Sequence, residues 1–176
     1  MRPSTNYFDF FGLPHKLNLD LKDLESRFYA LSKQWHPDRF ARGTADEQRA
    51  SEVATATLND GYRTLRDPVA RAEYLLKEHG LDGKGQRSNT VPPELLDEVF
   101  DLNTALEDEL ESSRSQLQEF QERFQKMNAS LDNELLERFA AYDDSESRLE
   151  LEAIRDILNK RKYISNLVQK VEKALA

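Results

Sequence analysis

Hydrophobic residues recur at steps of three and four along most of the chain, which is the spacing of one face of an α-helix. Between residues 20 and 35 the apolar positions are Leu21, Leu24, Phe28, Leu31 and Trp35. Asp20 is a candidate N-cap for this helix. Pro37 lacks an amide hydrogen and pushes His36 away from the α region, so we predict that the helix ends at Trp35.

A second amphipathic stretch follows this helix after a short loop. Thr44-Ala45-Asp46-Glu47 has the form of a capping box, and the helix that it opens should end at Arg66, before Asp67-Pro68. The apolar positions of this helix are Ala50, Val53, Ala54, Leu58, Tyr62 and Leu65. Two such helices predict an αα-hairpin with His36-Pro37-Asp38 exposed at its tip.

Shorter helices are predicted on both sides of the hairpin. Asn6 can cap an aromatic turn, Tyr7–Phe11, that Gly12 would end in the left-handed conformation. We expect its aromatic rings to pack into the core, because their burial is strongly favourable. A further helix should run from Val69 to His79, with His79 as a cap in its last turn rather than a metal ligand.

The second half of the chain predicts longer helices. Residues 80–93 are rich in Gly, Ser and Pro and mark a linker, and no Gly or Pro follows them. Three apolar stripes follow, with breaks near Ser112-Ser113 and Tyr142-Asp143-Asp144-Ser145. The stripes are Leu95, Val99, Leu102, Leu106 and Leu110; Leu117, Phe120, Phe124, Met127, Leu131 and Leu135; and Ile154, Ile157, Ile164, Val168, Val171 and Leu175. We predict an all-α protein: a hairpin domain at 1–79 and an antiparallel three-helix bundle at 94–176.

A few apolar residues miss these stripes. Leu96 and Phe100 lie to one side of theirs, in a segment, 94–111, that holds eight acidic residues and no basic one. Tyr163 is likewise displaced, next to the basic run 160–162. Either these side chains flank a broad core stripe, or they form an apolar patch with an acidic rim, as protein-binding surfaces do. The basic run either is solvated or pairs with the acidic helix.

Composition narrows the possible functions. The net charge is −8, with −1 on residues 1–83 and −7 on residues 84–176, which disfavours nucleic-acid and anionic-membrane partners. The chain has no cysteine, and its three histidines lack metal-ligand spacing, so we expect no metal and no cofactor. No apolar run reaches membrane length, and the N-terminus has no signal core, so we expect a soluble, cytoplasmic protein.

Several motifs in the first half resemble a J-domain. They are His36-Pro37-Asp38 after a helix, the aromatic start at Tyr7, and the segment from Leu65-Arg66-Asp67-Pro68 to Arg71-Ala72-Glu73-Tyr74. The whole chain resembles a narrower family, the HscB co-chaperones of iron–sulfur cluster assembly. Tyr7-Phe8, Phe11-Gly12-Leu13-Pro14, His36-Pro37-Asp38-Arg39-Phe40 and Arg71-Ala72-Glu73-Tyr74-Leu75-Leu76 match that family, as does the size of the second half.

This resemblance implies a chaperone adaptor of the bacterial type. The J-domain would stimulate a DnaK-class ATPase, HscA in this family, and the bundle would deliver the scaffold IscU to it. The residues implied to contact the ATPase are His36, Pro37, Asp38, Arg27, Lys33 and Arg39. Those implied to contact the scaffold are Leu96, Phe100, Asp101, Thr104, Asp108 and Tyr163.

Three alternatives to this function are an enzyme, a structural coiled coil and a co-chaperone for a different client. An enzyme that uses His36 and Asp38 as acid and base would lack a cysteine, a metal cluster and a nucleophile elbow, so we predict no enzymatic activity. A structural coiled coil would explain the second half but not the punctuated segment 80–93. A J-domain co-chaperone for a different client shares the entire first half and stays open as the alternative.

Overall fold

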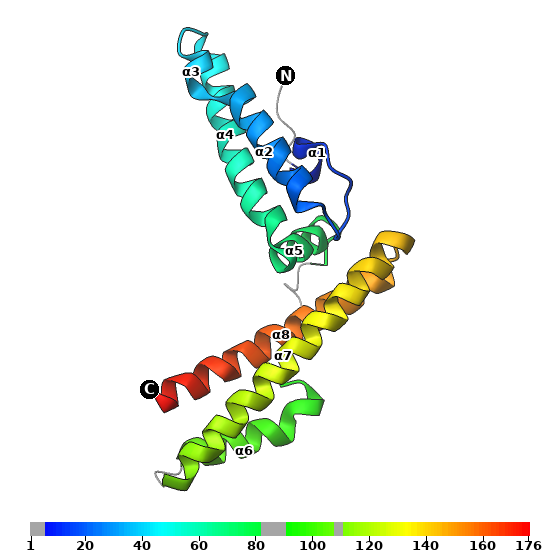
Figure 1. The fold of residues 1–176 in the computed structure, drawn as a ribbon. Coiled ribbons are helices and arrows are strands. Elements are labelled where there is room, and N and C mark those ends of the chain that lie inside the picture. Colours follow the sequence, from blue (N-terminus) through cyan, green and yellow to red (C-terminus); the bar gives the residue numbers. More distant parts are fainter. Residues whose placement is uncertain (1–5, 82–90, 108–110) are drawn as a thin grey trace. The chain divides into compact units, whose positions relative to one another are not determined.

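The structure is a computed structural model that describes residues 6–81, 91–107 and 111–176 (Figure 1). All regular elements in these ranges are helices, which confirms the predicted all-α class. The chain divides into two compact units, Met1–Gly80 and Leu81–Ala176. The first unit holds α1 (Tyr7–Phe11), α2 (Leu21–Trp35), α3 (Pro37–Phe40), α4 (Ala45–Arg66) and α5 (Pro68–Glu78). The second holds the short 3-10 helix η1 (Pro93–Leu95), α6 (Leu96–Glu107), α7 (Glu111–Ser145) and α8 (Arg148–Leu175).

The helix ends of the first unit follow the predicted capping residues. Asn6 and Asp20 accept hydrogen bonds from the first turns of α1 and α2, and Gly12 ends α1 at φ 63°. Thr44 and Glu47 form the reciprocal capping box at the start of α4. Helix α5 ends one residue earlier than predicted, with His79 as its C-cap. Local sequence signals therefore set the boundaries of this unit.

Helices α2 and α4 lie side by side as the hairpin, with α3 at its tip and α1 packed at its base (Figure 1). Phe8 and Leu24 are fully buried, so α1 and α2 each contribute to one core with α4. Gly61 makes this approach possible, because a Cβ there would lie 2.9 Å from a ring carbon of Phe11. The predicted packing of the aromatic turn is confirmed for Phe8 and Phe11, while Tyr7 and Phe10 are half-buried.

The apolar stripe of α4 differs from the prediction. Val53 is 52% exposed, because it lies 100° around the helix from the fully buried Ala54. Ser51 is buried in its place. Leu21, in the first turn of α2, is also about half exposed. Apolar residues alone therefore do not define the buried face of α4, because this face includes Ser51 and excludes Val53.

In the second unit, α7 and α8 form a long antiparallel pair (Figure 1). Arg161 Nε donates to Asp132 Oδ1 at 2.6 Å, and Asn128 Nδ2 donates to Ser165 Oγ at 3.2 Å. A break is present near Tyr142-Asp143-Asp144-Ser145, as predicted, but it falls just after this segment, since α7 continues to Ser145 and the turn lies at Glu146, whose φ is 49°. The break predicted near Ser112-Ser113 is also displaced, because α7 already begins at Glu111.

Helix α6 is much shorter than its two neighbours, so three helices pack together along only part of the bundle (Figure 1). Leu95 and Leu102 of the predicted stripe are buried against the long helices, and Leu106 is half-buried. Leu110 and Asp108 lie outside the described residues, as do residues 82–90 of the predicted linker. The exact extent of that linker stays a prediction.

Candidate functional site: the hairpin tip and the α6 face

The tip of the hairpin has a defined backbone conformation. His36 adopts φ −58° and ψ 129°, which ends α2, and Pro37 then occupies the first turn of α3. The amide of Arg39 donates to the carbonyl of His36 at 3.0 Å. The tripeptide is therefore not a free loop but the junction of two helices, which confirms that α2 ends at Trp35.

The side chain of His36 caps the helix that follows it. Its Nδ1 accepts a hydrogen bond from the amide of Asp38 at 3.3 Å. The ring therefore serves as the N-cap of α3. The Asp38 side chain is 91% exposed, and its carboxylate lies 3.5 Å from the same ring nitrogen. The tip thus presents a carboxylate to solvent from a fixed backbone.

Helix α4 holds the end of α2 at the tip by two hydrogen bonds. Ser51 Oγ donates to the carbonyl of Trp35 at 2.7 Å, and Thr55 Oγ1 donates to the same oxygen at 3.3 Å. The Trp35 ring stacks on Phe40, with 6.1 Å between ring centroids. These contacts satisfy the last carbonyl of α2, which a helix end leaves without an intrahelical partner.

The three predicted basic contacts have different surroundings. Lys33 is exposed in the last turn of α2, and Arg39 Nη1 donates to the Lys33 carbonyl at 3.2 Å, so both lie at the tip. Arg27 lies about 9 Å from Lys33 toward the N-terminal end of α2, at 1.5 Å per residue. Its guanidinium binds the carbonyls of Phe11 and Gly12 and the carboxylate of Asp23. Arg27 therefore holds the end of α1 in place and is only partly available to a partner.

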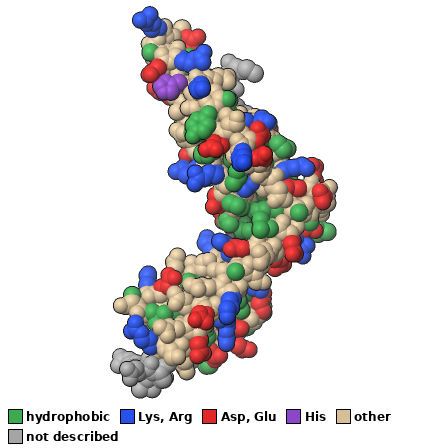
Figure 2. Space-filling model, in the orientation of Figure 1, with side chains coloured by type: hydrophobic (Ala, Val, Ile, Leu, Met, Phe, Trp, Pro, Cys, Tyr) green, Lys and Arg blue, Asp and Glu red, His purple; other side chains and the backbone are tan. Residues whose placement is uncertain are grey.

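Figure 2 shows that the α3 end of the first unit carries charged side chains of both signs and a histidine, with few hydrophobic ones on the face in view. Such a surface favours a polar docking contact with a charged partner.

The outer face of α6 has the opposite character. Leu96 is 53% exposed and Phe100, one turn further on, is 72% exposed. The neighbouring buried positions are Leu95 in η1 and Leu102 and Ala105 on α6. Because these residues fix the rotation of the helix, Leu96 and Phe100 point away from the core. Of the two interpretations left open by the sequence, these exposures favour an apolar surface patch over a broad core stripe.

Two lysines of α8 bind the neighbouring edge of η1 and α6. Lys160 Nζ donates to Glu94 Oε1 at 2.8 Å, and Lys170 Nζ donates to Asn103 Oδ1 at 2.7 Å. The hydrogen bond from Lys160 holds the pKa of Glu94 below its usual value. Part of the basic run 160–162 thus pairs with the acidic helix, as one sequence interpretation held.

Tyr163 lies on the same side of α8 as these two lysines, three residues after Lys160. Its side chain is partly buried, and this burial raises the pKa of its hydroxyl. Tyr163 therefore belongs to the α8 edge of the α6 face, level with the start of α6.

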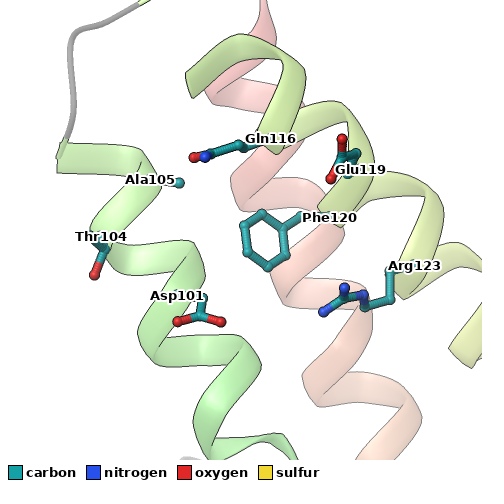
Figure 3. Close-up of a pocket in the computed structure, with 7 residues that line it drawn as sticks. All are labelled: Asp101, Thr104, Ala105, Gln116, Glu119, Phe120 and Arg123. Carbon is teal, nitrogen blue, oxygen red and sulfur yellow. The ribbon is translucent and has the colours of Figure 1, made fainter. Parts of the chain in front are cut away.

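The edge of α6 next to α7 is a hollow of about 400 Å³ (Figure 3). Helix α6 contributes Asp101, Thr104 and Ala105 to its wall, and α7 contributes Gln116, Glu119, Phe120 and Arg123. The predicted client residues therefore divide between two edges: Asp101 and Thr104 belong to the hollow, and Tyr163 belongs to the α8 side. The α7 residues of the hollow could not be predicted from the sequence, because the spacing places Phe120 at an ordinary core position.

Metal binding and membrane insertion can be checked in the part of the chain that the structure describes. No group of three or more His, Asp or Glu side chains there is arranged to hold a metal ion. Among the described helices, none combines the length and apolar character needed to cross a bilayer.

Comparison with known proteins identifies the family. The chain is 38% identical over 170 residues to the co-chaperone protein HscB homolog of Aliivibrio salmonicida, covering 96% of this chain and 95% of the relative. The chain belongs to the HscB family of co-chaperones. Residues 91–172 match the family model described as the HSCB C-terminal oligomerisation domain.

Solved HscB structures have the same fold. The chaperone HscB from Vibrio cholerae matches with a TM-score of 0.64 and 32% identity, over 97% of this chain and 99% of that one. The human co-chaperone HscB matches with a TM-score of 0.65 and 27% identity, over 98% and 83% of the two chains. The first unit is accordingly a J-domain, and the second is the C-terminal helical bundle of the family.

Proposed function

We propose that this HscB-family co-chaperone couples a DnaK-class ATPase, of the HscA type, to an IscU-type iron–sulfur scaffold in the bacterial cytoplasm. The observation that supports it most is that each unit has its own exposed surface of distinct chemistry. Asp38 is 91% exposed at the tip of the J-domain, and Phe100 is 72% exposed on α6 of the bundle. Two surfaces in one chain suit an adaptor for two partners.

The tip is the docking site for the ATPase in this proposal. The carboxylate of Asp38 engages a cationic group of the ATPase, and Lys33 and Arg39 add charge beside it. Because the backbone of the tip is fixed by the bonds described above, little ordering entropy is lost when it docks.

The α6 face is the docking site for the scaffold. Leu96 and Phe100 supply the apolar contact, Tyr163 borders it on the α8 side, and Asp101 and Thr104 border it on the α7 side. We include Asp108 as a further contact on the strength of the family resemblance. The adaptor then raises the concentration of each partner near the other, and the effect is reciprocal by linkage.

Binding of an IscU-type scaffold, measured by calorimetry, tests the α6 face. The double variant Leu96→Ala/Phe100→Ala should bind at least about 100-fold more weakly, because two apolar anchors are lost. The matched control is Leu136→Ala/Leu149→Ala, which removes exposed leucines elsewhere in the same unit and should bind as the wild type does. Binding that survives Leu96→Ala/Phe100→Ala would contradict the assigned face. No binding by the wild type would point to a different client.

Stimulation of the ATPase tests the tip. Asp38→Asn should abolish stimulation while scaffold binding is unchanged, because the two surfaces lie on separate units. Asp46→Asn, an exposed aspartate at the start of α4, is the control and should retain stimulation. Loss of both activities in Asp38→Asn would contradict the two-surface proposal.

A further inference from the structure

The two edges of α6 differ in how their charge is balanced. On the α8 edge the chain supplies its own cations, since Lys160 and Lys170 reach Glu94 and Asn103. On the α7 edge, neither Asp101 nor Glu119 has a hydrogen-bond or ion-pair partner among the described residues. The α8 edge therefore carries two lysines of the chain itself, whereas the carboxylates of Asp101 and Glu119 on the α7 edge are left unpaired within the described part of the chain.

The open side is also the hollow side. Asp101 on α6 and Gln116 and Phe120 on α7 point into the space between the two helices (Figure 3). The ring of Phe120 forms an apolar wall, and the side-chain amide of Gln116 adds an oxygen acceptor beside it. A hollow of about 400 Å³ lies within the range of ligand-binding cavities.

This combination selects a cation rather than an anion. The wall carries two carboxylates and one guanidinium, that of Arg123, so its net charge is negative. Arg123 lies 5.8 Å over the ring of Phe120, the position that a cation takes on an aromatic face. The chain thus already shows that a guanidinium is accommodated against this wall, while both carboxylates are left for another cation.

We propose that the hollow between α6 and α7 takes a lysine or arginine side chain of the client protein. Its methylenes lie against Phe120, and its charged end binds Asp101 and Glu119. This inference rests on the proposed function, because the hollow adjoins the α6 face through Asp101 and Thr104. The client surface would then pair an apolar patch with a neighbouring basic residue.

Scaffold binding by calorimetry is the first test. Asp101→Asn/Glu119→Gln keeps the shape of both side chains and should weaken binding about tenfold, since two partly exposed ion pairs are lost. The control Glu134→Gln/Glu137→Gln removes the same charge from exposed positions further along α7 and should have little effect. Arg123→Gln removes the competing cation and should strengthen binding about threefold. Wild-type affinity in Asp101→Asn/Glu119→Gln would overturn the inference.

A second measurement separates this inference from the proposed function. N-acetyl-arginine amide, titrated at millimolar concentration into the ¹⁵N-labelled chain, should shift the amide signals of Thr104, Gln116 and Phe120. The neutral isostere N-acetyl-citrulline amide should not, and Asp101→Asn/Glu119→Gln should abolish the shifts. If the scaffold does not bind but the arginine probe does, the client is wrong and the cation site stands. If the probe shifts no signals in the hollow, the cation site itself is disproved.

Discussion

The hairpin tip and the α6 face are both exposed, but their geometry is fixed in different ways. At the tip, hydrogen bonds within five residues set the backbone, and Ser51 and Thr55 secure it from α4. On α6, the side chains of Leu96 and Phe100 are apolar and make no hydrogen bonds, and their exposure follows from how Leu95 of η1 and Leu102 of α6 pack into the core. A polar site is therefore specified by local bonds, whereas an apolar site is specified by the core on its other side.

The largest expected effect comes from removing the core beneath each surface. Phe8→Ala should lower the stability of the J-domain by about 3–5 kcal/mol and abolish ATPase stimulation, because Phe8 is fully buried. Phe124→Ala should do the same to the bundle and to scaffold binding. Urea denaturation followed by circular dichroism, together with both activity assays, measures this. If either variant lost both activities, the two surfaces would not be independent.

A smaller effect is expected from loosening the tip without touching the core. Ser51→Ala removes the shorter of two hydrogen bonds to the Trp35 carbonyl and should lower stability by about 1 kcal/mol. ATPase stimulation should fall as well, while scaffold binding stays at its wild-type level. Ser26→Ala, an exposed serine on α2, is the control and should change neither quantity.

Arg27 and Lys33 separate a structural role from a docking role. Arg27→Met should lower stability by about 1 kcal/mol, because it removes bonds to the last carbonyls of α1. Lys33→Met should leave stability within about 0.5 kcal/mol of the wild type and weaken docking on the ATPase. Denaturation curves and the dependence of stimulation on co-chaperone concentration distinguish the two. Equal stability of both variants would show that the Arg27 bonds contribute nothing.

The smallest effect concerns the pH dependence of the bundle. The pKa of Glu94 is lowered in the folded protein by its hydrogen bond to Lys160, so the unfolded chain binds the proton more tightly. The resulting stability is present above pH 4.5, the usual pKa, and is lost as the pH falls through the lowered value. Glu94→Gln should therefore lose slightly less stability than the wild type on acidification, as measured by thermal unfolding. A steeper loss in the variant would contradict this sign.

The J-domain could be predicted from its sequence in most details. Asn6, Asp20, Thr44 and Gly12 cap the helices as predicted, because capping depends on residues within one turn of each other. The position of the hairpin tip could be predicted for the same reason, since Pro37 ends a helix whatever packs around it. The prediction was wrong where packing against residues distant in sequence decides which side chains are buried, as at Val53 and Ser51 on α4.

In the bundle, the sequence alone determined the all-α class, the three helices, and the off-stripe positions of Leu96 and Phe100, because helical periodicity is a property of each helix by itself. Only the tertiary structure decided that two lysines of α8 reach Glu94 and Asn103 on one side of α6 and that α7 leaves a hollow on the other. It also carried α7 to Ser145, so that the turn directly follows the segment in which the sequence suggested a break. The reason is physical: a helix face can be computed from spacing, but its neighbours depend on contacts with other helices, such as the two lysine contacts, which join residues 66 and 67 positions apart.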